Sequence, residues 1–537
     1  MRRNWRLAAL SLLALSTLVG TLAGDRLLAV STSTRDALRA YADLVTVAHA
    51  RYGREVSYRD LVFASIEGML RTLDPHSSFL SPEDYSRMRE KQQASFFGLG
   101  ILVGVRGGRL TVISPIEGSP AAKLGIRTGD VIERIEGEPT GKMSLDDAVS
   151  KLKGPRGSEV RITIVRAGLP EPLELTVTRD EISQTTVRYS YLIAPGTGYV
   201  SISDFSRSTA DEIAGALERL RAQGMERLIL DLRNNGGGLL DQAVEVSDQF
   251  LPEGSAIVET RGRVRDSKQE FEAAGRHPAF GLPLVVLVNS GTASAAEILS
   301  GAIQDHDLGL VVGTRTWGKG LVQTVYNLAY GAGLALTTAK YYTPSGRLIQ
   351  RDYHSFFDYQ TRAGVDNGDG ESEEPEGEIY STDIGRTVRG GGGIKPDVVV
   401  EPVELAPYLQ FLLARAAFFN FGVGYAESHP EIGRDWRPAP ELIDEFARWI
   451  VAQGIDTAEA VAAGLAEDTH RAYALRQIRA DALASKFGIE ASHQALAEGD
   501  LQIQEALTLF DRAEELLAQR AARPDLPRVA RAEPARD

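Results

Sequence analysis

The strongest constraint on the fold of this chain is a regular alternation of apolar runs and amphipathic stretches between residues 198 and 316. The runs GYVSISDF, RLILDLR, PLVVLVN and LGLVVGTRT are typical of strands, and ADEIAGALERLRAQ and TASAAEILSGAIQ between them are typical of helices. Such alternation predicts a largely parallel sheet covered by helices, with functional groups on the loops that leave the strands' carboxyl ends. We therefore expect an α/β core over residues 187–402.

The regions that flank this core differ from it in pattern. With 537 residues the chain is too long for one hydrophobic core. Short β-branched runs and glycine turns predict a small β-rich domain with one amphipathic helix, SLDDAVSKLKG, whereas helical spacing of apolar residues predicts two helical regions. An acidic, glycine-rich segment indicates a solvated loop, and the tail is expected to be disordered. The expected spans are 33–90 (helical), 95–180 (β-rich), 363–380 (acidic loop), 403–520 (helical) and 521–537 (tail).

The N-terminus has the layout of an export signal. Arg2, Arg3 and Arg6 precede an uncharged stretch that ends in small residues at Gly24. Its length lies between that of a cleaved signal and that of a spanning helix, so residues 1–24 are either a signal peptide or a retained membrane anchor. In both cases we expect the body outside the cytoplasm, periplasmic or otherwise extracytoplasmic, and in the second case anchored to the inner membrane.

Composition excludes several classes of function. The formal net charge is −14, which argues against a nucleic-acid partner because such partners favour a basic face. There are no cysteines, so disulfides, thiol catalysis and zinc–thiolate sites are excluded. We expect no cofactor and no metal.

Ser294 has two interpretations. In the stretch NSGTASAAEI it stands three residues before Glu297, which is the S-x-x-E pattern of a helix capping box. A nucleophilic serine would occupy the same place, but it needs a base, an orienting group and an oxyanion site. The ten residues alone do not decide between these roles.

A lysine is the better candidate for the base. The eight histidines are scattered, and His76 in LDPHSS, the best of them, suits a hydrogen-bonded turn equally well. In TWGKGLVQ, Lys319 is flanked by glycines and enclosed by apolar residues, and burial lowers the pKa of a lysine enough for it to accept a proton. Gln323 could orient the amine without adding charge, provided that Gly318 and Gly320 bend the chain.

The run TASAAEI, followed twenty-five residues later by GKGLVQ, closely resembles the C-terminal processing, or tail-specific, serine peptidases. LDPHSSFLSPEDY, LILDLRNNGGG, KYYTPSGRLIQ and GIKPDVVV also match, in order. The resemblance implies a crotonase/ClpP-like α/β protease core in which Ser294 is the nucleophile, Lys319 the general base and Gln323 its positioning residue. It also implies oxyanion donors at the backbone N–H groups of Ala295 and Gly238. Position 296 is alanine where many members have serine.

The β-rich domain resembles a PDZ domain in the circularly arranged form found in bacterial proteases. SFFGLGILV and GSPAAKLGIRTGDVIERIEG carry this resemblance, which implies that a loop presents N–H groups to the terminal carboxylate of a peptide. The peptide would add as a strand between this loop and the helix over 144–154. The predicted peptide-binding residues are Gly98, Leu99, Gly100, Ile101, Leu145 and Val149.

Together these features predict a serine endopeptidase that cuts exported proteins near their C-termini, with the PDZ-like domain binding the substrate tail. The alternatives are a non-catalytic peptide-binding module of the same fold and a crotonase-like acyl-CoA enzyme, for which an inserted peptide-binding domain makes little sense. The helical stretch after residue 402 is longer than that of the shorter members of this family, so the resemblance does not indicate its role. Because terminal amphipathic helices often bury their apolar stripe against another chain, we expect homo-oligomerisation through it.

Overall fold

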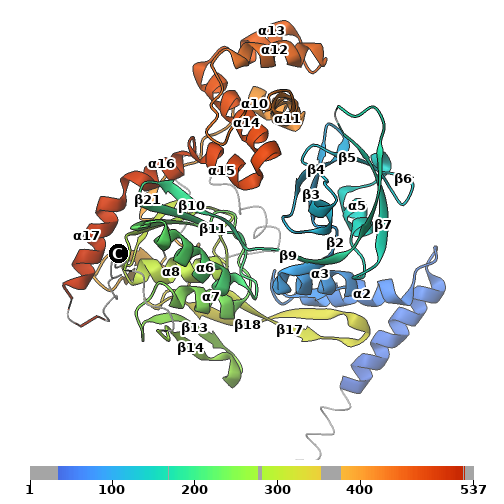
Figure 1. Cartoon of the computed structure of the whole chain (residues 1–537). Coiled ribbons are helices and arrows are strands. Elements are labelled where there is room, and N and C mark those ends of the chain that lie inside the picture. The colour runs from blue at the N-terminus through green and yellow to red at the C-terminus, as the bar shows by residue number, and fades with distance from the viewer. Residues whose placement is uncertain (1–33, 167, 276–280, 352–376, 524, 527–537) are drawn as a thin grey trace, which may run out of the picture. The chain divides into compact units, whose positions relative to one another are not determined.

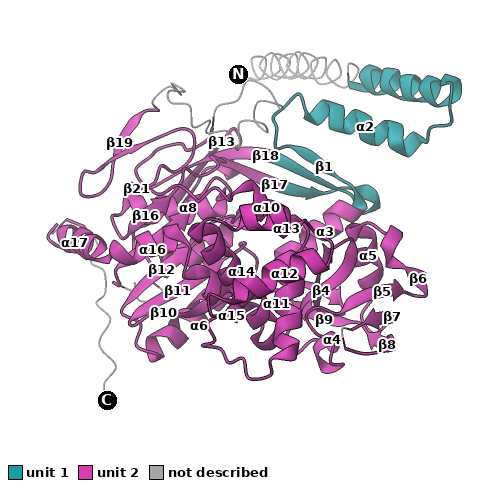
Figure 2. Cartoon of the chain, turned by 90° about the horizontal axis from the view of Figure 1, so that it is seen from above, with its two compact units in different colours: residues 1–82, 325–336 teal, residues 83–324, 337–537 magenta. Residues whose placement is uncertain are grey.

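The computed structural model describes residues 34–166, 168–275, 281–351, 377–523 and 525–526. The predicted signal or anchor over 1–24, most of the acidic segment 363–380 and most of the tail 521–537 lie outside these residues. The chain divides into two compact units, the first comprising residues 1–82 with 325–336 and the second 83–324 with 337–537 (Figure 2).

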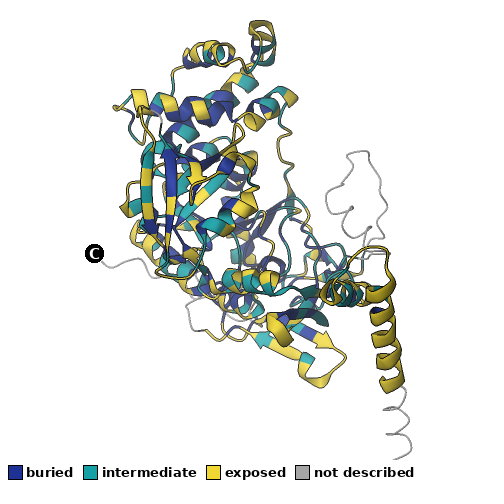
Figure 3. Cartoon of the chain, turned by 90° about the vertical axis from the view of Figure 1, so that its right-hand side faces the viewer, coloured by how far each residue is buried: buried dark blue, intermediate teal, exposed yellow. Residues whose placement is uncertain are grey.

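The first unit is mainly helical. A largely exposed helix over residues 34–51 (Figure 3) precedes α2 (Tyr58–Leu70). Ser57 caps α2 by accepting a hydrogen bond from the Asp60 N–H at 3.0 Å. Strand β1 (Ser78–Leu80) pairs antiparallel with residues 333–335. Over the residues with described structure, no helix combines the length and hydrophobicity needed to cross a membrane.

The PDZ-like domain belongs to the second unit, which begins within α3 (Pro82–Gln93). Its main sheet has the order β3-β4-β5-β7-β8, so β3 is an edge strand, and β2 pairs with β9. Helix α5 starts at a capping box in which Ser144 and Asp147 bond reciprocally. The elements are β2 (Ser95–Gly98), β3 (Ile101–Arg106), β4 (Arg109–Pro115), α4 (Pro120–Lys123), β5 (Val131–Ile135), β6 (Glu138–Pro139), α5 (Leu145–Leu152), β7 (Glu159–Val165), β8 (Leu173–Thr178) and β9 (Asp180–Ser183).

The α/β core contains the sheet that the alternating pattern predicts (Figure 1). Six strands have the order β10-β11-β12-β15-β16-β21, and all neighbouring pairs are parallel except β10 with β11. A smaller antiparallel sheet joins β13 (Ala256–Gly262) to β14 (Gln269–Glu272) and to residues 339–342 of β18 (Gly333–Tyr342). The six strands are β10 (Val187–Ala194), β11 (Thr197–Ile202), β12 (Arg227–Asp231), β15 (Leu284–Val288), β16 (Leu310–Gly313) and β21 (Val398–Val399).

Both faces of the six-stranded sheet are covered, because successive strand residues point to opposite sides. Val286 and Val288 pack with α6 (Thr209–Ala222), α7 (Leu240–Asp248) and α8 (Ala295–Asp305). Val285 and Leu287 pack instead with α16 (Leu501–Thr508) and α17 (Phe510–Ala521). The core therefore extends past residue 402, and the apolar stripe of these last helices is buried within the chain.

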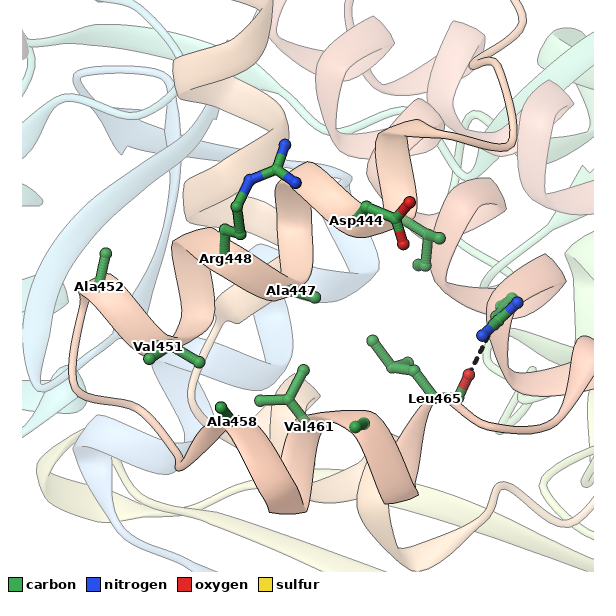
Figure 4. Close-up of a pocket in the computed structure, with 11 residues that line it drawn as sticks. Asp444, Ala447, Arg448, Val451, Ala452, Ala458, Val461 and Leu465 are labelled. Atoms are coloured by element: carbon green, nitrogen blue, oxygen red, sulfur yellow. Dashed lines mark hydrogen bonds between the residues drawn. The ribbon is translucent and has the colours of Figure 1, made fainter.

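The helices before α16 form clusters of their own. The larger is built around aromatic residues such as Phe418, Phe421 and Phe446. A cavity of about 510 Å³ lies between α12 and α13 (Figure 4), and none of the predicted catalytic residues lines it. These helices are α10 (Pro407–Ala414), α11 (Ala417–Ser428), α12 (Leu442–Ala452), α13 (Ala458–Gly464), α14 (Asp468–Phe487) and α15 (Ile489–Ala497).

Replacing Phe510 with alanine tests whether the C-terminal helices are part of the core. Phe510 is 1% exposed and packs on the sheet, so we expect the free energy of unfolding to fall by about 3–4 kcal/mol. Leu501→Ala, at a side chain that is 54% exposed on α16, should change it by less than about 0.5 kcal/mol. Urea denaturation of both variants measures the difference, and equal values would contradict this packing.

Candidate active site

Ser294 lies in the short loop between β15 and α8, immediately before the helix begins. Its backbone has φ +57° and ψ −115°, a left-handed conformation that is uncommon for residues other than glycine. Such strained residues cluster at functional sites, where the surrounding structure holds them in place. The residue is partly exposed, so its hydroxyl is open to approach.

The carboxylate of Glu297 holds this loop from inside the protein. Its side chain is fully buried and accepts the Ser294 N–H at 2.7 Å, which is the Glu297 half of the expected capping box. It also accepts the Thr316 hydroxyl at 2.5 Å and the N–H groups of Gly318 and Lys319 at 2.8 and 3.0 Å. Burial raises the pKa of Glu297, and these hydrogen bonds oppose that rise. One carboxylate thus joins the serine loop to the lysine loop.

Lys319 lies in the loop between β16 and β17 (Leu321–Asn327). Its Nζ donates a hydrogen bond to Gln323 Oε1 at 2.7 Å, so the expected contact between these side chains is present. The bend that it requires occurs at Gly318, whose φ is +87°. A Cβ at Gly318 would lie 2.9 Å from the backbone nitrogen of Gly393, so only glycine fits there.

The predicted oxyanion donors lie on adjoining segments. Gly237 approaches the serine so closely that a Cβ would lie 2.7 Å from Ser294 Cβ and 2.9 Å from the Ala295 nitrogen. Gly238 has φ +154°, and a Cβ there would lie 2.1 Å from the carbonyl oxygen of Phe205. Among the residues that the structure describes, neither the Gly238 nor the Ala295 N–H donates to a protein acceptor. Both donors are therefore available, and Ala295 is at the positive end of α8.

Asn235 is a structural link that the sequence analysis missed. Its side chain accepts the Gly237 N–H at 2.9 Å and donates to the Ile202 carbonyl at 2.8 Å. Its backbone carbonyl accepts the Ala293 N–H at 2.9 Å, which ties the glycine loop to the serine loop. The available signal was the NNGGG turn after an apolar strand, but nothing in that turn distinguishes Asn235 from Asn234.

Among the residues of this unit that the structure describes, no histidine is hydrogen-bonded to Ser294. His306 is at the opposite end of α8, where its Nδ1 lies 2.9 Å from Asp383 and its Nε2 lies 2.7 Å from the Ala256 carbonyl. His76 belongs to the first unit, in a turn where Asp74 accepts its N–H. Within the described ranges, no cluster of three or more His, Asp or Glu side chains could hold a metal ion.

The predicted peptide-binding residues belong to the turn before β3 and to α5 of the PDZ-like domain. Gly98 ends β2, Gly100 has φ +75°, and Ile101 begins the edge strand β3. Leu99 is only 2% exposed and packs in the domain core, so its side chain lines no groove and it can contribute only its backbone. On α5, Leu145 is 39% exposed and Val149 is partly buried. An open strand edge beside a partly apolar helix suits strand addition.

A serine at a strand–turn–helix junction, next to unoccupied backbone N–H groups and near a partly buried lysine, is typical of α/β hydrolases. Sequence comparison identifies the family. Residues 196–354 match peptidase family S41 and residues 111–166 match the PDZ domain. The chain belongs to the carboxy-terminal processing proteases of family S41. Its fold is therefore an S41 protease core with a PDZ domain and a helical C-terminal region.

Three proteins illustrate the similarity. The carboxy-terminal-processing protease of Bartonella bacilliformis is 38% identical over 322 residues, which cover 59% of this chain and 74% of the relative. The carboxyl-terminal-processing protease of Synechocystis sp. is 41% identical over 304 residues, covering 56% and 70%. The solved photosystem II D1 C-terminal processing protease is 30% identical, with 66% and 85% covered and a TM-score of 0.35.

The variant Glu297→Gln tests the buried carboxylate link. Glutamine keeps one acceptor oxygen, but its NH₂ group would face donors that now bond to the second oxygen. Two of the four hydrogen bonds would be lost, so we expect unfolding free energy to fall by about 2–4 kcal/mol, measured by denaturation. Glu218→Gln, at an exposed position on α6, should leave stability unchanged. A stable Glu297→Gln protein would show that the carboxylate does not hold the two loops.

Proposed function

We propose that this protein is a serine endopeptidase that cuts exported proteins near their C-termini, with Ser294 as nucleophile and Lys319 as general base. One observation carries the proposal. The Ser294 and Lys319 N–H groups share the Oε2 atom of Glu297, while the Lys319 amine is directed to Gln323. This shared carboxylate supports the proposal, because it links the backbones of two segments that are twenty-five residues apart in sequence and that carry the proposed nucleophile and base.

The proposed reaction proceeds in two steps. Ser294 Oγ attacks the carbonyl carbon of the scissile peptide bond while the neutral Lys319 amine takes its proton. The C–N bond then breaks, and Lys319 passes the proton to the departing amine. Water attacks the resulting acyl-enzyme ester, again losing a proton to Lys319, and the carboxylic acid product leaves as Ser294 recovers its hydrogen. Gln323 keeps the amine oriented without adding a charge that would favour its protonated form.

The backbone N–H groups of Gly238 and Ala295 would stabilise the oxyanion in both steps. Their freedom from protein acceptors supports this role, since an oxyanion hole needs donors that are preorganised and unoccupied. Each such donor contributes about 3 kcal/mol to the stability of a transition state. The alternative interpretation, a non-catalytic peptide-binding module, gives no role to the hydrogen-bonded pair Lys319 and Gln323.

The PDZ domain would capture the substrate's C-terminus. Strand β3 is free at the sheet edge, and a peptide added there would run beside α5 with its carboxylate at the Gly98–Ile101 loop. We further propose that the body acts outside the cytoplasm, with residues 1–24 as signal or inner-membrane anchor, and that it assembles into homo-oligomers. Since α16 and α17 bury their stripe within the chain, other helical surfaces would form the contact between copies.

Alanine substitutions at the proposed catalytic positions test the reaction. Ser294→Ala and Lys319→Ala should each lower the cleavage rate of an unstructured protein with an apolar C-terminus at least about a thousandfold, because the nucleophile or its base is lost. The rate is measured by mass spectrometry of the products formed by the purified full chain. Ser290→Ala and Lys340→Ala, at exposed residues nearby in sequence, should retain wild-type rates. Cleavage by Ser294→Ala at the wild-type rate would refute the peptidase proposal.

Substitutions in the proposed tail groove test the PDZ domain. Leu145→Lys places a charge on α5 where an apolar tail residue would pack, so KM for a substrate with an apolar C-terminus should rise about tenfold with little change in kcat. Leu124→Lys, at a side chain that is 46% exposed outside the groove, should have no effect. Equal kinetics for the two variants would mean that the domain does not select the tail through α5.

A further inference from the structure

The C-terminal helices reach the carboxyl end of β12, where the glycine loop of the oxyanion site begins. Residues Asp500 and Gln502 at the start of α16 contact Arg233, which follows β12 by two residues. The family match ends at residue 354, so these helices lie beyond the part of the chain that it covers.

Arg233 is held by three side chains. Its guanidinium bonds to both carboxylate oxygens of Asp231, with distances of 2.6–3.0 Å. Its Nη1 also lies 2.8 Å from Asp500 Oδ2 and donates to Gln502 Oε1 at 2.8 Å. Such forked, charge-assisted bonds fix geometry as well as adding energy. Arg233 and Asp231 are both mostly buried, so solvent competes little with these contacts.

Gln502 also contacts the backbone of the α/β core at Val400. It is 5% exposed, and its Nε2 donates to the carbonyl of Val400 at 2.7 Å. Asp500 also caps α16, because its Oδ1 accepts the N–H groups of Gln502 and Ile503 at 3.0 and 3.2 Å. The helix start is thus rigid where it meets Arg233.

Aromatic residues extend the network to α15. Tyr199 donates a hydrogen bond to Asp231 at 2.7 Å, and Tyr191 lies 3.0 Å from Nδ1 of His493. The His493 ring stacks on Tyr189 with 3.9 Å between ring centroids. Burial lowers the pKa of His493 to about 4, so the imidazole is neutral near pH 7 and does not repel Arg233.

The network continues directly into the catalytic loops. Asp231 accepts the Arg233 N–H at 2.9 Å, which fixes the turn after β12. In that turn the Leu232 carbonyl accepts the Asn235 N–H at 3.2 Å and the Thr292 hydroxyl at 2.8 Å. Asn235 in turn bonds to Gly237 and Ala293, on either side of the proposed oxyanion site. A shift of Arg233 would therefore change the position of Gly238.

We propose that Gln502 and Asp500 are positioning residues for the oxyanion site, so that the C-terminal helices contribute to catalysis. Their contacts with Arg233 fix the conformation of the turn that leads to Gly238. The direction in which the unoccupied Gly238 N–H points depends on that conformation. This inference rests on the proposed serine peptidase function. It assigns to the helical extension a role in transition-state stabilisation in addition to covering the sheet.

The test is Gln502→Leu in the full chain, which removes both the acceptor for Arg233 and the donor to Val400 and keeps a side chain of similar size. We expect kcat to fall about tenfold, with KM changed less than about twofold. The loss in kcat should be smaller than the roughly hundredfold loss that follows removal of an oxyanion donor, because the donor is displaced and not removed. The rate is expressed per Ser294 that reacts with a fluorophosphonate probe, which the serine attacks with loss of fluoride. The second-order rate of that labelling should fall in parallel.

Three further variants separate positioning from folding. Gln504→Leu makes the same change two residues along α16 at an exposed position and should behave as wild type. Gln502→Glu keeps an acceptor for Arg233 but loses the donor to Val400, so it should restore only part of the rate. Asp500→Asn keeps a capping side chain but removes the charge, so about a threefold loss in kcat is expected for a neutral partner of Arg233.

The outcomes are distinguishable. Unchanged kcat per labelled serine in Gln502→Leu overturns the inference, even if fewer serines can be labelled, because that pattern means a folding defect alone. Unchanged kcat in Asp500→Asn also overturns it, since the charged contact with Arg233 would then not matter. A wild-type chain that neither reacts with the probe nor cuts protein overturns the peptidase proposal itself.

Discussion

The carboxylate of Glu297 accepts four hydrogen bonds in the protein interior, from Ser294, Thr316, Gly318 and Lys319, and the rest of the site depends on it. A buried carboxylate is unfavourable unless its oxygens are satisfied, so the two loops must approach closely for this one to be stable. The same bonds that satisfy Glu297 fix the backbone on which the serine and the lysine stand. One arrangement therefore meets the electrostatic requirement and also links the two loops that carry the proposed nucleophile and base.

The six-stranded sheet extends this dependence to the C-terminal helices. Its strands are apolar on both faces, and α6, α7 and α8 cover only one of them. The other needs α16 and α17, which also deliver Asp500 and Gln502 to Arg233. The same helices thus cover a hydrophobic surface and contact Arg233 in the turn before Gly238.

Much of this could be predicted from the sequence because it is local or periodic. Alternating apolar runs identified the parallel sheet, and S-x-x-E identified the start of α8. The contact of Lys319 with Gln323 followed from two glycines that permit a bend. The burial of the Leu99 side chain could not be predicted in the same way, because a G-x-G turn does not show which way the residue between its glycines points.

The sequence by itself determined the elements, the residue types of the site and the family to which the chain belongs. Only the tertiary structure decided which distant residues meet. Asn235, Arg233 and Gln502 carry no local signature, since an amide or a guanidinium can be a surface group as readily as a link. Their roles arise from burial and from partners that are distant along the chain, such as Ile202 for Asn235 and Gln502 for Arg233. Hydrogen bonds of that kind depend on positions in space, which spacing along a sequence does not encode.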